Sequence, residues 1–385
     1  KKNTIVRITT IPLSLEKLLG GQLQFMSNFF NVIAISSDKD RLKEYGKSQS
    51  VNTHHIEMTR KITPIQDLKC LIKLFIFLKK NKPLIVHSHT PKAGIIAMLS
   101  SYLANIPIRM HTVAGLPLLE EKGIKRVVLN FIEKLTYRCS TNVYPNSSGL
   151  KNIILENKFT KINKLTIIAN GSSNGIDTSY FNPELFSKEK QQTVRRNLKI
   201  RNDDFVFIFV GRIVGDKGIN ELVEAFEKLS KDNSKVKLLL VGQYEDNLDP
   251  LKKQTKFIIN NNEQIVSVGY QNDVRPYFSI ADSLVFPSYR EGFPNVVMQA
   301  GAMGLCSIVS NINGCNEIIE NNKNGIIIPV KDTNEIHDAM IKICYDKNLF
   351  MKLKLNSRSL IKKRYQRELI WTSLLKEYNN LLNRI

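Results

Sequence analysis

The chain has 385 residues, of which 42% are hydrophobic and 24% charged. This composition is typical of a globular protein, and the length suits two α/β domains better than one core. The apolar runs are shorter than the ~18 residues of a membrane-spanning helix. The sequence opens on a strand-like run rather than a signal core, so we expect a cytoplasmic protein.

The formal net charge is +21, and it is unevenly distributed. Residues 1–183 carry 26 Lys and Arg against 11 Asp and Glu, a balance of +15. Residues 184–385 carry 30 against 24, a balance of +6. The first half therefore suits an anionic partner, although a Lys-rich coding bias would explain part of the excess. No nucleic-acid module is recognisable, so no nucleic-acid partner is expected.

In the first half, short apolar runs alternate with amphipathic segments. Strands are predicted at residues 5–8, 32–35, 84–86, 106–110, 142–144 and 165–168, and helices at 64–80 and 94–104. This alternation favours parallel βαβ units. Residues 177–202 are polar and broken, and we expect the domain linker there.

The alternation then restarts. Strands are predicted at residues 205–210, 237–241, 265–268, 283–286, 307–309 and 325–328, and helices at 219–231 and 295–303. The sequence thus predicts two Rossmann-like domains, 1–183 and 184–365, with a final helix at 366–385 packing back on the first. A ligand is expected in the cleft that faces the carboxyl ends of the strands.

The most informative motif follows the strand at residues 283–286. Glu291 stands at the predicted strand tip, Gly292 lets the backbone approach a ligand, and a helix begins near Asn295. A helix start offers free N–H groups to an anion, and a carboxylate beside it suits hydroxyls. A nucleotide sugar carries hydroxyls next to phosphates, so this motif suits a nucleotide sugar as ligand. Glu291 as an ordinary first-turn helix residue is the alternative.

A second motif follows the strand at residues 205–210. Gly211-Arg212 stands at its tip, and a Gly-rich loop carries Lys217 before the next helix. Arg212 and Lys217 could together neutralise a diphosphate. The alternative is a surface loop with two solvated cations.

The first half carries histidines at two predicted strand ends. His87-Ser88-His89 precedes Lys92, and His111 follows the next strand. His87 and His89 could ligate zinc, but no third ligand lies nearby in sequence, so no metal site is expected. The widely spaced cysteines and the charged Asp38-Lys39-Asp40 loop add no metal site either.

These motifs resemble those of the retaining glycosyltransferases of family four, which have the GT-B fold. Within that family the chain is similar to bacterial enzymes that extend capsular, O-antigen or lipid-linked oligosaccharides. The resemblance covers nearly the whole chain and also includes Gly20-Gly21-Gln22, His111 to Pro117 and Asn170 to Asp177.

The resemblance implies the site residues. The catalytic group is expected to comprise Glu291, His111, Arg212 and Lys217. The donor is expected against Gly21, Gln22, Gly211, Gly292, Phe293, Asn295, Val296 and Gln299. His89, Lys92 and Asn170 are expected on the acceptor side of the cleft.

The chain departs from the family at one position. The family has a second Glu eight residues after the first, to hold the ribose hydroxyls, and here Gln299 stands there. An amide oxygen still accepts a hydrogen bond but lacks the strength of a carboxylate.

The resemblance implies metal-independent, retaining transfer from UDP-hexose or UDP-HexNAc to a lipid-linked glycan, in capsule or lipopolysaccharide biosynthesis. No cofactor is expected, since the nucleotide sugar is a substrate, and the chain is expected to be a monomer or weak dimer. The other classes considered are a non-catalytic sugar-nucleotide or nucleic-acid binding protein and a GT-B epimerase.

Residues 120–138 read as an amphipathic helix with a basic rim. Its cations are Lys122, Lys125, Arg126, Lys134 and Arg138. Such a helix could dock on the anionic inner face of the plasma membrane. The alternative is a core-packed helix with a solvated outer face.

Overall fold

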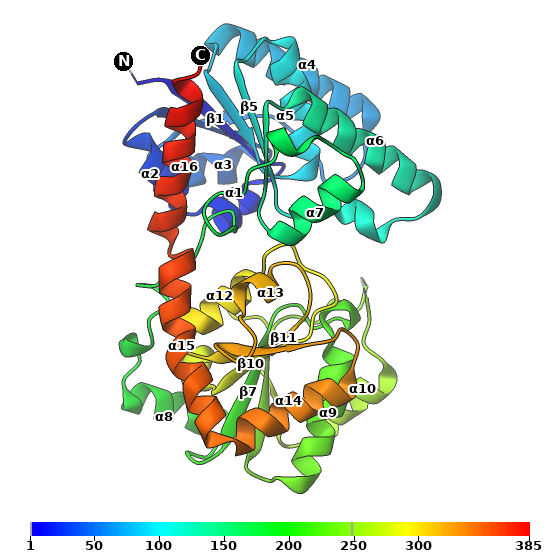
Figure 1. The fold of residues 1–385 in the computed structure, drawn as a ribbon, viewed down its shortest axis with the longest axis vertical. Helices are drawn as coiled ribbons and strands as arrows, with labels where there is room; N and C mark the ends of the chain where they lie inside the picture. The colour runs from blue at the N-terminus through cyan, green and yellow to red at the C-terminus, as the bar shows by residue number, and fades with distance from the viewer. Residues whose placement is uncertain (1, 248) are drawn as a thin grey trace. The chain divides into compact units, whose positions relative to one another are not determined.

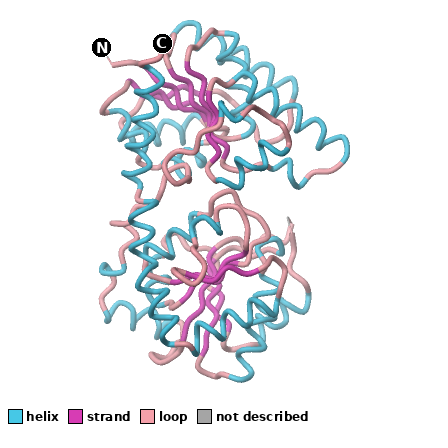
Figure 2. Tube along the Cα trace, viewed as in Figure 1, coloured by secondary structure: helices cyan, strands magenta, loops and turns pink. Residues whose placement is uncertain are grey.

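The computed structural model describes residues 2–247 and 249–385. The chain forms two compact units, the first comprising Lys1–Asn174 with Arg367–Ile385 and the second Gly175–Gln366. Each unit is a six-stranded parallel sheet with helices against it (Figures 1 and 2). The predicted α/β class with two Rossmann-like units is therefore confirmed.

The first unit has the strand order β3-β2-β1-β4-β5-β6. Its strands are β1 (Thr4–Ile8), β2 (Asn31–Ser36), β3 (Asn52–His55), β4 (Ile85–Ser88), β5 (Ile108–Val113) and β6 (Asn142–Pro145). Successive side chains of β1 point to opposite faces, so that Ile5 belongs to one apolar cluster and Val6 to another. Both faces of the sheet are consequently covered, as parallel sheets require.

The two faces are covered by different helices. The first set is α1 (Pro12–Leu19), α2 (Gln22–Ser27), α3 (Lys39–Gln49) and the C-terminal α16 (Arg367–Leu382), which share a core with Ile5. The second set is α4 (Pro64–Asn81), α5 (Pro91–Leu103) and α6 (Gly123–Cys139), with α5 packed between the other two (Figure 1). The smaller α7 (Ser148–Glu156) follows β6.

The second unit has the strand order β12-β11-β10-β7-β8-β9 and a single large core. Its strands are β7 (Phe205–Val210), β8 (Val236–Val241), β9 (Ile265–Ser267), β10 (Ser283–Phe286), β11 (Cys306–Ser310) and β12 (Gly325–Ile328). Its helices are α8 (Lys188–Asn197), α9 (Ile219–Asp232), α10 (Lys253–Asn261), α11 (Arg275–Ile280), α12 (Asn295–Ala302), α13 (Cys315–Ile318), α14 (Thr333–Tyr345) and α15 (Lys347–Tyr365). Because β7 and β10 are neighbours, the loops that follow them meet at one edge of the sheet.

The structure differs from the sequence predictions in three places. Residues 165–168 are not a strand, since Leu165 makes only an isolated bridge to Val143. The edge strand β3 was not predicted, because its residues Asn-Thr-His-His lack an apolar pattern. Residues 177–202 lie inside the second unit and contain α8, so the chain crosses between units after Asn174 and again after Gln366.

The final helix packs as predicted. Leu374, Tyr378 and Leu381 of α16 belong to the core of the first unit. Among residues 2–247 and 249–385, no helix has the length and apolar character needed to cross a bilayer.

Candidate active site

In the second unit, Lys217 and Glu291 form an ion pair at the ends of two adjacent strands. Lys217 Nζ lies 2.5 Å from Glu291 Oε1, and Ser288 Oγ donates to the same oxygen at 3.2 Å. Ser288 is fully buried, and both charged side chains are largely buried. A cation and a carboxylate held this close have little freedom, so a ligand would meet a preorganised pair.

Backbone contact between the two loops creates this arrangement. Gly218 has φ +71°, and a Cβ there would lie 2.2 Å from Pro287 O, so only glycine fits. Tyr289 N also donates to Asp216 O at 2.9 Å. The Gly-rich loop after β7 is thereby pinned to the loop after β10, which brings Lys217 to Glu291.

Arg212 lies apart from this pair. Its Nη1 donates to Glu245 Oε2 at 3.1 Å, and 45% of its side chain is exposed. Glu245 follows β8, on the other side of β7 from β10. The two cations that the sequence groups together therefore have separate carboxylate partners in this structure.

The helix α12 begins directly after this site. Phe293 is buried, whereas Asn295 is exposed and Val296 and Gln299 are half-buried. Gly314 packs closely against this loop. A Cβ at position 314 would lie 2.8 Å from Gly292 O, so a larger residue would displace the loop. The first N–H groups of α12 are not used within the helix and could receive an anion.

In the first unit, the strand tips hold a buried cluster around Arg7. Arg7 Nε donates to His89 Nε2 at 3.0 Å, and its Nη2 donates to Gln22 Oε1 at 2.5 Å. His87 contacts Tyr378 Oη and Thr112 Oγ1 at 2.7 Å each. Burial lowers the pKa of Arg7 from its ordinary value. A guanidinium this deeply buried requires hydrogen-bond acceptors, and His89 and Gln22 supply two of them.

Burial keeps the three histidines of this cluster neutral. It lowers the pKa of His111 to about 4 and holds those of His87 and His89 well below their ordinary value. His111 Nδ1 lies 2.8 Å from Ser88 Oγ. Its ring packs on Gly94, where a Cβ would be 2.5 Å from Cε1. These residues can therefore accept or donate hydrogen bonds but carry no positive charge at neutral pH.

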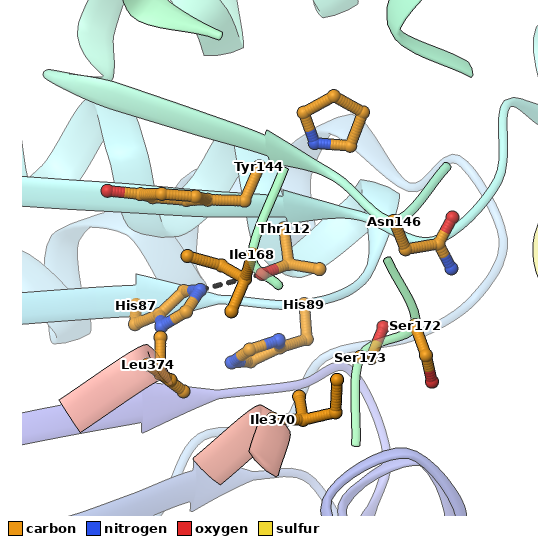
Figure 3. Close-up of a pocket in the computed structure, with 11 residues that line it drawn as sticks. His87, His89, Thr112, Tyr144, Asn146, Ile168, Ser172, Ser173, Ile370 and Leu374 are labelled. Carbon is orange, nitrogen blue, oxygen red and sulfur yellow. Dashed lines mark hydrogen bonds between the residues drawn. The ribbon is translucent and has the colours of Figure 1, made fainter. Parts of the chain in front are cut away.

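A small cavity of ≈ 20 Å³ lies beside His87 and His89 (Figure 3). Since His89 Nε2 accepts from Arg7, its neutral ring carries the proton on Nδ1, and this buried atom has no hydrogen-bond partner in the protein. Asn146 Oδ1 and Ser173 Oγ of the same lining are likewise without one. The volume fits about one water molecule, and these polar atoms could bind it.

The C-terminal helix α16 is connected to the Gly20-Gly21-Gln22 turn through hydrogen bonds of Asn174. Trp371 Nε1 donates to Asn174 Oδ1 at 2.7 Å, and Gln22 Nε2 donates to the same oxygen at 3.1 Å. Asn174 Nδ2 in turn donates to Gly20 O at 3.0 Å. The Gln22 side chain is fully buried, so a ligand at this turn would meet backbone rather than the amide.

Comparison with known proteins decides to which protein family this chain belongs. Residues 190–360 match the family model described as glycosyl transferases group 1, and residues 21–147 match the one described as glycosyl transferase 4-like. The chain is 33% identical over 383 residues to the capsular polysaccharide biosynthesis glycosyltransferase CapM of Staphylococcus aureus, covering 99% of this chain and 98% of that protein. The chain belongs to the group 1 glycosyltransferases.

Two further similarities extend this result. The glycosyltransferase is 29% identical over 337 residues to the UDP-Gal:alpha-D-GlcNAc-diphosphoundecaprenol alpha-1,3-galactosyltransferase of Escherichia coli, covering 86% of this chain and 84% of that one. Its fold matches Anabaena HepE in complex with UDP with a TM-score of 0.82, at 16% identity, over 99% of this chain and 100% of that one. The expected GT-B fold is confirmed.

Within this glycosyltransferase, the structure brings together only part of the predicted site. Lys217 meets Glu291, whereas Arg212 pairs elsewhere and Lys92 forms an ion pair with Asp67 of α4. Asn170 is exposed in a turn that lies beyond α7. Asp38 caps α3 by accepting from Arg41 N at 3.2 Å. The described residues contain no cluster of three or more metal-ligating side chains.

Sequence reasoning missed several residues of these clusters, among them Arg7, Asn174, Ser288 and Tyr378. Only Arg7 gave a signal, because a charged residue within an apolar strand requires a buried partner. The others are ordinary polar residues whose contacts appear only when the strands and the final helix are assembled.

Proposed function

We propose that this glycosyltransferase transfers a hexose or N-acetylhexosamine from a UDP-sugar to a hydroxyl of a lipid-linked glycan, with retention and without a metal. The observation that carries the proposal is the pair of Lys217 and Glu291. The ammonium suits the donor diphosphate, and the carboxylate beside it suits a sugar hydroxyl. Both groups are fixed by Ser288 and by the contact between their loops.

The transfer requires stabilisation of the departing diphosphate. Lys217 supplies one positive charge, and the N-terminus of α12 supplies N–H groups after Gly292. We assign Arg212 to the same diphosphate, for which it would have to exchange Glu245 for the ligand. With these cations, negative charge on the leaving group is balanced by the chain itself. Retention places the acceptor hydroxyl on the same face as the leaving phosphate.

The relatives support the donor and acceptor classes. The name of the E. coli relative specifies UDP-Gal as donor and a diphosphoundecaprenol-linked acceptor, and the HepE structure contains UDP. The Staphylococcus relative acts in capsular polysaccharide biosynthesis, and we propose the same kind of pathway here. We assign the reaction to the cytoplasmic side of the membrane.

The test is a transfer assay with a panel of UDP-sugars and an undecaprenyl-diphosphate-linked glycan, in the presence of EDTA. We expect one UDP-sugar to give a product whose new linkage keeps the donor's anomeric configuration, as read by NMR. Loss of activity with EDTA or an inverted linkage would contradict the mechanism. A chain that binds UDP-sugars but transfers nothing would be a binding protein.

A further inference from the structure

The helix α4 has an apolar stripe on its outer face. Ile65, Leu68, Ile72 and Ile76 recur at intervals of three and four residues and are all exposed, Ile65 to 76%. This spacing places them on one side of the helix. Cys70, Leu74 and Leu78 on its other side pack into the core of the first unit. The exposed stripe is therefore additional to the apolar face that the fold uses.

The helix α6 repeats the pattern in its first two turns. Ile124, Val127, Val128 and Phe131 are exposed, with Ile124 at 85% and Phe131 at 65%. The buried side of this helix is formed by other residues, among them Thr136 and Tyr137. The helices α4 and α6 flank α5 in one layer on the sheet (Figure 1), so both stripes lie on the outside of that layer. We call these exposed side chains of α4 and α6 the α4–α6 face.

The charges around the α4–α6 face are almost all positive. The two helices carry eight cations: Lys69, Lys73, Lys79, Lys80, Lys125, Arg126, Lys134 and Arg138. Of their two carboxylates, Asp67 pairs with Lys92 and Glu133 is buried, and Glu121, just before α6, pairs with Lys125. Burial raises the pKa of Glu133 to about 7. The face thus combines apolar side chains with a basic rim.

We infer that the α4–α6 face docks on an anionic lipid bilayer, lying in the interface without crossing it. The inference rests on the proposed function, which gives the enzyme a lipid-linked acceptor. Apolar stripes flanked by cations match the chemistry of a headgroup layer, in which apolar side chains enter the acyl boundary and lysines contact phosphates. A second copy of the chain is a poorer occupant, because a two-fold contact would set the lysines of one face against those of the other.

The experiment compares flotation of the full chain with vesicles of phosphatidylglycerol and phosphatidylcholine, and with phosphatidylcholine alone. The test variant is Ile65→Gln with Ile72→Gln and Phe131→Gln. The matched control, Phe257→Gln with Met351→Gln and Leu355→Gln, changes three exposed apolar residues of the second unit. Because all six side chains are exposed, neither variant should unfold the protein.

We expect the test variant to lose at least tenfold in partitioning onto phosphatidylglycerol vesicles, with the control unchanged. Lys69→Gln with Lys73→Gln should lower binding by about fivefold for each side chain and weaken its salt dependence. Equal binding by wild type and test variant, or no binding by wild type at low salt, would overturn the inference. A dimer in solution that the test variant converts to monomer, without vesicle binding, would make the face a protein interface instead.

Failure of the inference can be distinguished from failure of the proposed function. A water-soluble analogue of the acceptor does not require docking, so the test variant should transfer sugar to it at the wild-type rate. If wild type binds vesicles but transfers sugar to neither acceptor, the proposed function fails and the docking surface stands. If transfer to both acceptors is normal in the test variant and vesicle binding is unchanged, the docking inference fails alone.

Discussion

Lys217 Nζ lies 2.5 Å from Glu291 Oε1, although the two residues are 74 positions apart in the chain. Each follows a buried strand, and the two strands, β7 and β10, are hydrogen-bonded neighbours. The ion pair therefore follows from sheet topology together with the close approach of Gly218 to Pro287. Its position at the carboxyl ends of parallel strands is where such folds bind ligands.

We expect Lys217→Ala to lower kcat by ~10²-fold or more, because it removes a cation from the developing charge of the leaving group. The matched control is Lys228→Ala, which removes an exposed lysine of α9 that pairs with Glu224. Steady-state kinetics in EDTA measure both, and thermal unfolding checks that each variant is folded. Normal turnover by the Lys217 variant would exclude it from the reaction.

Gln299 should limit nucleotide affinity. If it holds the ribose, Gln299→Glu replaces a neutral acceptor by a charged one and should tighten UDP binding by roughly fivefold. Because the ribose is remote from the bond that breaks, kcat should change little. Calorimetry with UDP measures the affinity, and Gln299→Leu should weaken it. Equal affinities for all three proteins would assign the ribose to other residues.

The buried histidines should make the first unit sensitive to acid. Burial lowers the folded pKa of His111 to about 4, whereas the unfolded chain binds a proton near pH 6.5. Between these values the unfolded state holds more protons, so stability is full above pH 6.5 and falls as the pH decreases towards 4. From pH 7.5 to pH 5 the His111 share of this loss is about 2 kcal/mol in unfolding free energy.

Urea unfolding at pH 7.5 and pH 5 tests this prediction. His111→Gln keeps a hydrogen-bonding group near Ser88 but cannot titrate, so it should lose about 2 kcal/mol less than wild type over this interval. The matched change His337→Gln, at a partly exposed position of α14, should behave as wild type. A His111 variant with the wild-type pH dependence would show that this ring does not titrate on unfolding.

The sequence was sufficient to predict all six strands of the second sheet and five of the six in the first, because buried parallel strands are short continuous apolar runs. The sequence also indicated that Lys217 and Glu291 lie in the loops that follow two such runs, which is where the structure has them. It could not predict that Arg212 pairs with Glu245, because Glu245 lies in a loop without an apolar pattern. Loop partners of this kind depend on strand order, which the sequence alone does not specify.

The first unit was harder to predict for a related reason. The contact of His87 with Tyr378 joins positions 291 residues apart, and it requires the final helix to return to the first sheet. The return of this helix was predicted, but not which of its side chains would reach the strand tips. The segment at 165–168 is apolar enough for a strand, yet it lies beyond β6 and makes a single bridge.

The turn at Gly21 gives the last prediction. Gly21 has φ +77°, a conformation that costs a residue with a Cβ about 1–2 kcal/mol. A Cβ there would also lie 2.9 Å from Cη2 of Trp371, which is the only tryptophan of the chain. Gly21→Ala should therefore lower the free energy of unfolding by at least this amount and alter the intrinsic fluorescence of the folded protein.

Gly115→Ala is the matched control, because a Cβ at Gly115 would meet nothing within 4 Å. It should leave both the stability and the tryptophan emission close to wild type. In the Gly21 variant the strain falls on the turn that Asn174 and Trp371 hold, so the KM for the donor should rise more than kcat falls if this turn contacts the diphosphate. A Gly21 variant with lower stability but an unchanged donor KM would make the turn a structural element of the first unit and remove it from the donor site.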